Sequence, residues 1–274
     1  DAVVVTISHL GYIKRTSLSE FRTQGRGGIG SRGSTTRDED FLEHLFVATN
    51  HNYLLIFTQK GQCYWMRVFD IPEGTRQSKG RAIINLVQLA ADDKVVAYLN
   101  VKDLKSEEYL NNHFVVLCTK KGIIKKTTLE AYSRPRANGI IAVGIREGDE
   151  LLEARLTNGS SHIILASKDG KAIHFEESDV RPMGRGASGV IGMNLDDEDG
   201  KNQVVGMLTI DASEITTRQV LVVSSKGYGK RSPVEDYRII NRGGKGVKTL
   251  QVTDKTGKLV AIKDVREDDH LMII

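Results

Sequence analysis

Short runs of apolar, mostly β-branched residues recur along the chain, and each run ends in a glycine. The runs are VVVTISHLG (3–11), YLLIFTQKG (53–61), FVVLCTKKG (114–122), HIILASKDG (162–170) and VLVVSSKG (220–227). A run of this length, closed by a glycine, is typical of a buried β-strand that leads into a tight turn. Further strands are predicted over 82–89, 94–101 and 151–156, and the best helix candidate, 105–114, gives at most two turns. The pattern therefore predicts an all-β chain.

A second glycine follows each of these turn glycines at a nearly constant distance. The turn glycines are Gly11, Gly61, Gly122, Gly170 and Gly227, and the second, loop glycines are Gly30, Gly80, Gly139, Gly189 and Gly246. The separation is 19 residues in four cases and 17 in the third. Such a repeat predicts blades of antiparallel sheet set around an axis. We place the repeats at 1–50, 51–111, 112–159, 160–217 and 218–268, with the start of a sixth at 269–274, in a single domain over 1–274.

The composition places the chain among soluble proteins of a reducing compartment. Hydrophobic residues make up 39% and charged residues 27%, and 27 glycines against 4 prolines agree with many tight turns. The two cysteines, Cys63 and Cys118, have no metal or redox spacing, which argues against a disulfide framework. No apolar run approaches the length of a membrane helix. The first ten residues read as a strand entered within a domain, so we expect the chain to be part of a longer protein.

The glycines of the first loop match a nucleotide-binding pattern, but their context does not. GRGGIG (25–30) satisfies G-x-G-x-x-G, whereas the segment that follows, SRGSTTRDEDFLEH, has no apolar stripe for the required helix. The equivalent fifth loop, INRGGKG, breaks the pattern, and Lys245 is followed by Gly246 rather than by the Ser or Thr of a phosphate-binding loop. A dinucleotide enzyme is therefore the least favoured function.

What the loops share is an arginine beside small residues. It stands four residues before the loop glycine, or three in the third repeat: Arg26, Arg76, Arg136, Arg185 and Arg242. Arginine binds phosphate through its bidentate fork, and glycine allows a close backbone approach. From turn glycine to loop glycine the five segments carry a net charge of +10, whereas the whole chain carries +4. This concentration of positive charge predicts a basic band that binds a long polyanion by its phosphates, and duplex DNA fits best.

The residues expected to contact DNA lie in these loops and in the basic pairs just after the turn glycines. They are Lys14, Arg15, Arg22, Arg26, Arg32, Arg76, Lys79, Arg81, Lys125, Lys126, Arg134, Arg136, Arg185, Lys230, Arg231, Arg238, Arg242, Lys245 and Lys248. No catalytic residue or metal ligand is expected. The seven histidines lack ligand or triad spacing, and LDDEDG fails as a calcium loop because Leu195 falls at its first ligand position.

The repeats resemble those of the C-terminal domain of the DNA gyrase A subunit. The resemblance rests on GYIKRTSLSEFRTQGRGGIG and GYGKRSPVEDYRIINRGGKGVKTL. Within the first, QGRGGIG is similar to the family's gyrase-A box, Q-[RK]-R-G-G-[RK]-G. The box residues are Gln24, Gly25, Arg26, Gly27, Gly28, Ile29 and Gly30, and Gly25 and Ile29 replace two usually basic positions. The family fold is a β-pinwheel, a propeller-like disc of four-stranded blades that exchange strands with their neighbours. It implies five complete repeats and the start of a sixth here.

The resemblance also implies a function. The family wraps double-stranded DNA around a basic rim with positive handedness, which enables ATP-dependent negative supercoiling by a holoenzyme of two A and two B subunits. The implied partners are DNA, the rest of gyrase A and gyrase B, in the bacterial cytoplasm at the nucleoid, and the isolated domain is expected to be a monomer. No cofactor is expected in this non-catalytic domain, because ATP and Mg²⁺ act elsewhere in the holoenzyme. The alternatives are a propeller-like protein-interaction scaffold and the C-terminal domain of the topoisomerase IV A subunit.

Overall fold

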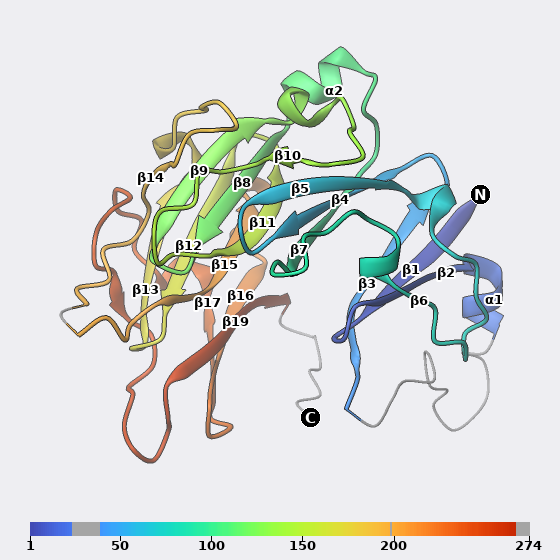
Figure 1. Cartoon of the computed structure of the whole chain (residues 1–274). Helices are drawn as coiled ribbons and strands as arrows, with labels where there is room; N and C mark the ends of the chain where they lie inside the picture. The colour runs from blue at the N-terminus through green and yellow to red at the C-terminus, as the bar shows by residue number, and fades with distance from the viewer. Residues whose placement is uncertain (24–38, 198, 267–274) are drawn as a thin grey trace. The chain divides into compact units, whose positions relative to one another are not determined.

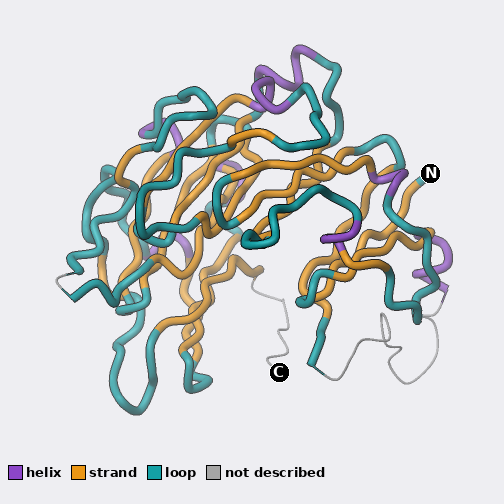
Figure 2. Tube along the Cα trace, viewed as in Figure 1, coloured by secondary structure: helices purple, strands orange, loops and turns teal. Residues whose placement is uncertain are grey.

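The chain is built almost entirely of strands and turns. The computed structural model describes residues 1–23, 39–197 and 199–266, and the elements below refer to these ranges (Figure 1, Figure 2). The strands are β1 (Ala2–Ser8), β2 (Tyr12–Ser17), β3 (Leu42–Thr49), β4 (Tyr53–Thr58), β5 (Gln62–Arg67), β6 (Arg81–Ala82), β7 (Val95–Val101), β8 (Phe114–Thr119), β9 (Ile123–Thr128), β10 (Ile140–Ile141), β11 (Leu151–Thr157), β12 (Ser161–Ser167), β13 (Lys171–Glu176), β14 (Val190–Ile191), β15 (Val204–Asp211), β16 (Arg218–Ser224), β17 (Gly229–Pro233), β18 (Val247–Lys248) and β19 (Leu259–Arg266).

Helical structure is short. The α-helices are α1 (Leu18–Thr23) and α2 (Glu107–Asn111), and the 3₁₀ turns are η1 (Val68–Asp70), η2 (Ile83–Asn85), η3 (Leu129–Tyr132), η4 (Glu177–Asp179), η5 (Ala212–Glu214) and η6 (Val234–Asp236). The helix predicted over 105–114 is confirmed as the single turn of α2. Strands β7 and β11 confirm the predictions for 94–101 and 151–156.

The strand predicted over 82–89 is wrong beyond its first residue. Only Arg81–Ala82 form a strand, and η2 follows at once. The Ile83 backbone N–H donates to the Gly11 carbonyl at 2.8 Å, and the Leu86 N–H then turns back to the Ile83 carbonyl at 2.9 Å. Ile83 is buried by this turn, so its apolar side chain serves the core without belonging to a strand.

The strands form five antiparallel sheets in sequence order. Four have four strands, ordered β3-β1-β2-β6, β10-β5-β4-β7, β11-β8-β9-β14 and β15-β12-β13-β18, and within the described residues the fifth has three, ordered β17-β16-β19. The hairpins β1–β2, β4–β5, β8–β9, β12–β13 and β16–β17 each turn at a glycine in the left-handed region, at the five turn glycines predicted from the sequence. Together with the comparisons below, these sheets confirm the predicted all-β fold and its five repeats. The sixth repeat was predicted at 269–274, which lies outside the described residues.

Neighbouring repeats exchange strands. The short strand β6 comes from the second repeat but pairs with β2 of the first, and β14 and β18 likewise pair with β9 and β13 of the repeats before them. One backbone bond of 2.8 Å recurs at each exchange. The residue three after a loop glycine donates to the turn glycine of the preceding repeat: Ile83 to Gly11, Ala142 to Gly61, Gly192 to Gly122 and Thr249 to Gly170. A sheet is therefore completed only when the next repeat folds.

The core lies between successive sheets. Strand β12 shows the principle, because Ile163 and Leu165 point into one hydrophobic cluster with β8 and β13, whereas Ile164 and Ala166 point into another with β15 and β16. Successive side chains of a strand face opposite sides of the sheet, so a strand buried on both faces needs apolar residues at every position. This explains why the runs that reveal the repeat are continuous rather than alternating.

The chain forms two compact units. The first comprises 1–58, 62–107 and 132–140, and the second comprises 59–61, 108–131 and 141–274. The first unit holds the cluster between β1 and β4, in which Val3, Val5, Leu54 and Ile56 are buried. The second holds the two clusters that share β12.

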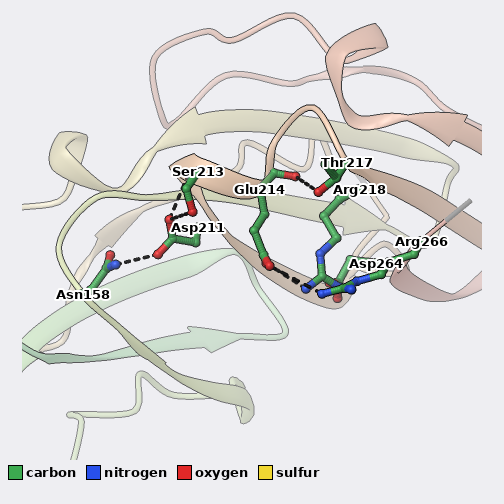
Figure 3. A network of polar contacts seen from close by, with 8 residues as sticks. All are labelled: Asn158, Asp211, Ser213, Glu214, Thr217, Arg218, Asp264 and Arg266. Carbon is green, nitrogen blue, oxygen red and sulfur yellow. Dashed lines mark hydrogen bonds and ion pairs between the residues drawn. The ribbon is translucent and has the colours of Figure 1, made fainter.

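Carboxylates fasten the connection between the fourth and fifth repeats. The Arg218 guanidinium lies between Glu214, at 2.7 Å, and Asp264, at 3.4 Å (Figure 3). Asp211 accepts hydrogen bonds from the Ser213 backbone N–H at 2.9 Å and from the Asn158 amide at 2.6 Å. The arginine on this side of the fifth sheet is thus matched by acids.

Candidate nucleic-acid interface

The arginine-bearing loops of the second, fourth and fifth repeats lie along the second strand of the repeat before each of them. The Arg15 N–H donates to the Pro72 carbonyl at 3.0 Å, and the Gly74 N–H donates to the Arg15 carbonyl at 3.0 Å. In the later repeats, the Met183 N–H donates to Lys126 and the Ile240 N–H to His174, each at 2.8 Å. These bonds fix the start of the loop before its arginine is reached.

A side chain at the same register position reinforces this contact. It stands four residues after the turn glycine and donates to a carbonyl of the next repeat. The pairs are Arg15 Nε to Ile71 at 2.7 Å, Trp65 Nε1 to Tyr132 at 2.9 Å, Lys126 Nζ to Glu177 at 3.3 Å and His174 Nδ1 to Tyr237 at 2.8 Å. The position therefore joins repeats whether its side chain is charged, aromatic or neutral. Arg15 was expected to contact DNA, and the structure gives its Nε this joining role.

Lys126 also forms a buried ion pair. Its Nζ lies 3.5 Å from the Glu177 carboxylate, and the exposed fraction of the two side chains is 5% and 0%. Glu177 further accepts from the Thr157 hydroxyl at 2.8 Å and from the Ser161 N–H at 3.1 Å. With its hydrogen-bonding groups satisfied, this pair holds the fourth loop against the third repeat.

The residues one position earlier, Lys14 and Lys125, lie beneath the loops. They are 2% and 1% exposed. Lys14 Nζ donates to the carbonyls of Thr75, Arg76 and Ser78 at 2.9, 2.7 and 2.7 Å. Lys125 Nζ donates to Ala142 at 2.6 Å and to Arg185. We expected Lys14, Lys125 and Lys126 to contact DNA directly, but their ammonium groups are covered by protein, and we leave them out of the contact set.

The loop arginines also reach back to the preceding repeat. Arg76 is 9% exposed, stacks over Phe21 with 4.6 Å between its Cζ and the ring centre, and donates to the Phe21 carbonyl at 3.2 Å. Arg185 donates to Ile141 at 3.2 Å, and Arg242 donates to Asp179 at 3.1 Å and to Ile191 at 3.0 Å. Joining repeats is therefore the reason why these arginines stand beside the small residues. Arg185 and Arg242 stay half-buried, with part of each guanidinium facing solvent.

The exposed cations lie in the same loops, at recurring positions. Directly before or just after the loop glycine stand Lys79, which is half-buried with its Nζ 4.0 Å from the Tyr12 ring centre, and the exposed Arg81, Lys245 and Lys248. Lys245 pairs with Asp196 at 3.1 Å. The other predicted cations that are exposed are Arg22, Arg134, Arg136, Lys230, Arg231 and Arg238. Arg231 donates to Gln219 and to the Arg266 carbonyl.

One exposed cation of this set was missed by sequence reasoning. Arg181 is exposed and stands eleven residues after its turn glycine. Arg22 and Arg238 occupy the same position in the first and fifth repeats. Comparing the loops position by position reveals it, because all three arginines stand eight residues before their loop glycine. The box residues 24–30 and Arg32 lie outside the described residues, and their role stays a prediction.

Metal-ligating side chains and thiols complete the account of the described part of the chain. Within it, no group of three or more His, Cys, Asp or Glu side chains could hold a metal ion. Cys63 and Cys118 are both buried and unbridged, and burial raises the pKa of the Cys118 thiol. None of the described helices is long and apolar enough to cross a membrane.

Comparison with known proteins identifies the family of this chain. The family described as "DNA gyrase C-terminal domain, beta-propeller" matches five successive segments, 2–49, 52–102, 113–158, 161–210 and 218–266. The chain belongs to this family. It is 42% identical over 274 residues to the DNA gyrase A subunit of Staphylococcus aureus, with 100% of the chain aligned to 30% of that protein. The chain thus spans less than a third of the curated relatives that it matches.

Two solved structures have a similar fold. A DNA gyrase A C-terminal domain superposes with a TM-score of 0.73 at 27% identity, covering 98% of this chain and 84% of that one. The C-terminal domain of a DNA topoisomerase IV superposes with a TM-score of 0.68 at 21% identity, covering 98% and 94%. The second likeness shows the fold alone, whereas the family membership and the identity to gyrase A confirm the resemblance stated from the sequence.

Proposed function

We propose that this gyrase-family chain binds and positively wraps double-stranded DNA through the exposed cations of its repeated loops. One observation carries the proposal: cations recur at equivalent loop positions, as with Arg22, Arg181 and Arg238, and stay exposed while neighbouring cations are buried. A ligand that meets the same group at more than one repeat is itself repetitive. A phosphate backbone has that property and needs no base readout.

In the cell, the proposed role belongs to a longer protein. The wrapped duplex would present DNA to the ATP-dependent strand-passage machinery of gyrase, so that negative supercoils result. We propose that this chain contributes no catalytic group to that reaction, that the rest of gyrase A together with gyrase B are its partners, and that it acts in the bacterial cytoplasm at the nucleoid. On its own it is proposed to be a monomer.

A topology assay tests the wrapping. Nicked circles are closed by ligase in the presence of the 274-residue chain and then freed of protein. Positive wrapping leaves a linking-number increase that grows with protein and reaches a plateau. If the linking number does not change at saturating protein, wrapping is refuted, and the topoisomerase IV alternative is favoured.

The dependence of binding on salt tests the contact chemistry. Each phosphate neutralised on a duplex lowers the slope of log K against log salt by about 0.9. A contact set spread over several loops therefore predicts a steep negative slope. Binding to a protein partner that is indifferent to salt, without duplex binding, would instead support the interaction-scaffold alternative.

A further inference from the structure

The residue three positions after the turn glycine is alternately a lysine and an uncharged residue, but its location stays the same. It is Lys14, Tyr64, Lys125 and Ile173 in the first four repeats, and each side chain lies beneath the loop of the next repeat. Tyr64 lies so close to Gly139 that an added Cβ would be 2.7 Å from its ring, and an added Cβ at Gly244 would be 3.5 Å from Ile173 Cδ1. The second and fourth loops, by contrast, rest on an ammonium group.

An ammonium group under a loop dictates how the peptide units of that loop point. A buried charge is tolerated only when polar groups solvate it, and Lys14 recruits three carbonyls to do so. In a trans peptide the N–H points opposite to the C=O. With the carbonyls of Thr75, Arg76 and Ser78 turned inward, the N–H groups of the residues after each of them turn outward.

The outward face of this loop has the features of an anion site. Outward N–H groups beside glycine form concavities that bind anions. The same loop borders an open depression of about 760 Å³, which is lined by Thr75, Ser78, Lys79 and Arg81 and also by Asp70 and Glu73. Glu73 is paired with Arg15 at 3.3 Å. In the fourth loop, Lys125 holds the Arg185 carbonyl inward, and the glycines on either side, Gly184 and Gly186, face open space.

We propose that Lys14 and Lys125 are positioning residues, whose buried ammonium groups hold the second and fourth loops in the conformation that binds a DNA phosphate. The inference rests on the proposed DNA binding and adds two buried residues that set the conformation of the binding loops. The ammonium acts from below through the loop backbone, and the phosphate is held from above by the outward N–H groups and the exposed cations.

The charge on these lysines is set by their surroundings. Burial, together with the facing Arg76, lowers the pKa of Lys14 to about 8, although Glu20 of α1 acts in the opposite direction. Burial and the facing Arg185 lower the pKa of Lys125 to about 8. Deprotonation leaves two N–H groups and a lone pair, so Lys14 could no longer donate to three carbonyls at once. Lys125 would keep two N–H donors for its two carbonyls, but uncharged donors form weaker hydrogen bonds than an ammonium group. Both loops should therefore be held less firmly in their phosphate-binding conformation as the pH rises through about 8.

Stability should move in the other direction, which separates positioning from a general structural role. The folded-state pKa lies below the ordinary 10.5. Between these two values the unfolded chain keeps a proton that the folded chain has released, so the lysines' contribution to stability rises with pH. A loss of DNA affinity in this window cannot then be attributed to unfolding caused by these two groups.

The experiment measures duplex affinity from about pH 7 to about pH 9.5 at constant ionic strength, using a fluorescent duplex and the 274-residue chain. The unsubstituted chain should lose about tenfold in affinity, the equivalent of one or two charge-assisted hydrogen bonds. Lys14→Met/Lys125→Met should bind weakly at the lower pH and show a flat profile. Ile173→Met, a substitution at the same position under a loop without an ammonium, should keep the original profile.

Three outcomes decide the matter. If duplex affinity of the unsubstituted chain does not change with pH while binding still depends steeply on salt, the positioning role is overturned. It is also overturned if the double variant keeps the original pH dependence. Absence of salt-dependent binding at neutral pH overturns the proposed function itself. If the double variant does not fold, Lys125→Met alone, which loses fewer carbonyl contacts, should retain about half of the pH response on a logarithmic scale, and a full response overturns the proposal.

Discussion

At the residue scale, Gly189 and the arginines Arg76, Arg185 and Arg242 serve the contact between repeats. Gly189 has a φ of +92°, and a Cβ added to it would lie 2.5 Å from the Ile124 carbonyl of the preceding repeat. Two requirements, a left-handed backbone and a close approach, therefore select glycine there. The sequence pattern predicted the glycine and the arginine, but it could not show what they contact, because that partner belongs to the preceding repeat.

Gly189→Ala and Gly227→Ala should differ in cost although both glycines have a positive φ. Gly227 has a φ of +83° and no atom near an added Cβ, so alanine there should cost about 1–2 kcal/mol of backbone strain. Gly189→Ala adds the collision with Ile124, for about 3 kcal/mol or more in total. Urea unfolding of the two variants checks this, and equal losses would contradict the role of close approach.

Arg76→Ala should destabilise the chain. For Arg26, an exposed loop position in the sequence, we predict that Arg26→Ala weakens wrapping and barely changes thermal stability. Arg76, however, stacks on Phe21 and donates to its carbonyl. Losing both interactions should cost about 1–3 kcal/mol. Thermal unfolding measures it, with the exposed Arg136→Ala as the matched loop arginine. An unchanged melting temperature for Arg76→Ala would restore the view that it serves only DNA.

At the element scale, the second strand of a hairpin belongs to its own sheet and also contacts the loop of the next repeat. The strands themselves could be predicted, since burial on both faces leaves a continuous apolar run. The short exchanged strands could not, because two residues carry too little pattern and their pairing partner belongs to another repeat. The same is true of the lysines. Lys14 and Lys125 look like solvent-exposed charges in the sequence, and only the covering loop makes them interior groups.

The joint between β13 and the fifth loop should make stability depend on acidity. His174 donates from Nδ1 to Tyr237, so its Nε2 accepts from His162 Nδ1 at 2.9 Å. Burial lowers the pKa of His174, reinforced by His162 and opposed by the Tyr237 carbonyl and Glu176. Below the ordinary value of 6.5 the unfolded chain binds a proton that the folded chain resists, so stability should fall as the pH drops.

Urea unfolding at about pH 7 and about pH 5, on either side of the ordinary histidine value, measures this dependence. His174→Gln should lose stability at the higher pH, because the bond to Tyr237 is disturbed, but should lose less than the unsubstituted chain between the two pH values. His51→Gln, at an exposed histidine, serves as the control and should keep the full dependence. An unaltered dependence in the His174 variant would show that another group is responsible.

At the scale of the whole molecule, the chain distributes one task over five similar parts. The net charge of +4 conceals loops that together carry +10, and the acids gather elsewhere, as around Arg218. Composition alone could not predict the function because the two signs nearly cancel. Aligning the repeats separated the basic loops from the acidic segments. The resemblance to the gyrase family then linked the basic loops to DNA.

Loops of separate repeats should contribute additively to duplex binding. Lys79→Ala/Arg81→Ala and Lys245→Ala/Lys248→Ala should each reduce the salt slope by about 1.8, and the quadruple variant by about 3.6. The matched control is Lys94→Ala/Lys105→Ala, at two exposed lysines outside the loops, which should change the slope little. Filter binding over a salt series checks this. A control pair that lowers the slope equally would show that only total charge matters.

The exchange of strands has a consequence for how such a chain can change its length during evolution. A segment one repeat long contains, wherever it begins, one short strand that pairs with a neighbouring sheet and one sheet edge that accepts such a strand. Duplication or deletion of one whole repeat, in whatever phase the recombination falls, rejoins a donor to a receiver and leaves no additional edge unpaired. A crossover between repeats therefore needs no particular boundary, and the number of blades can change while each joint stays the same.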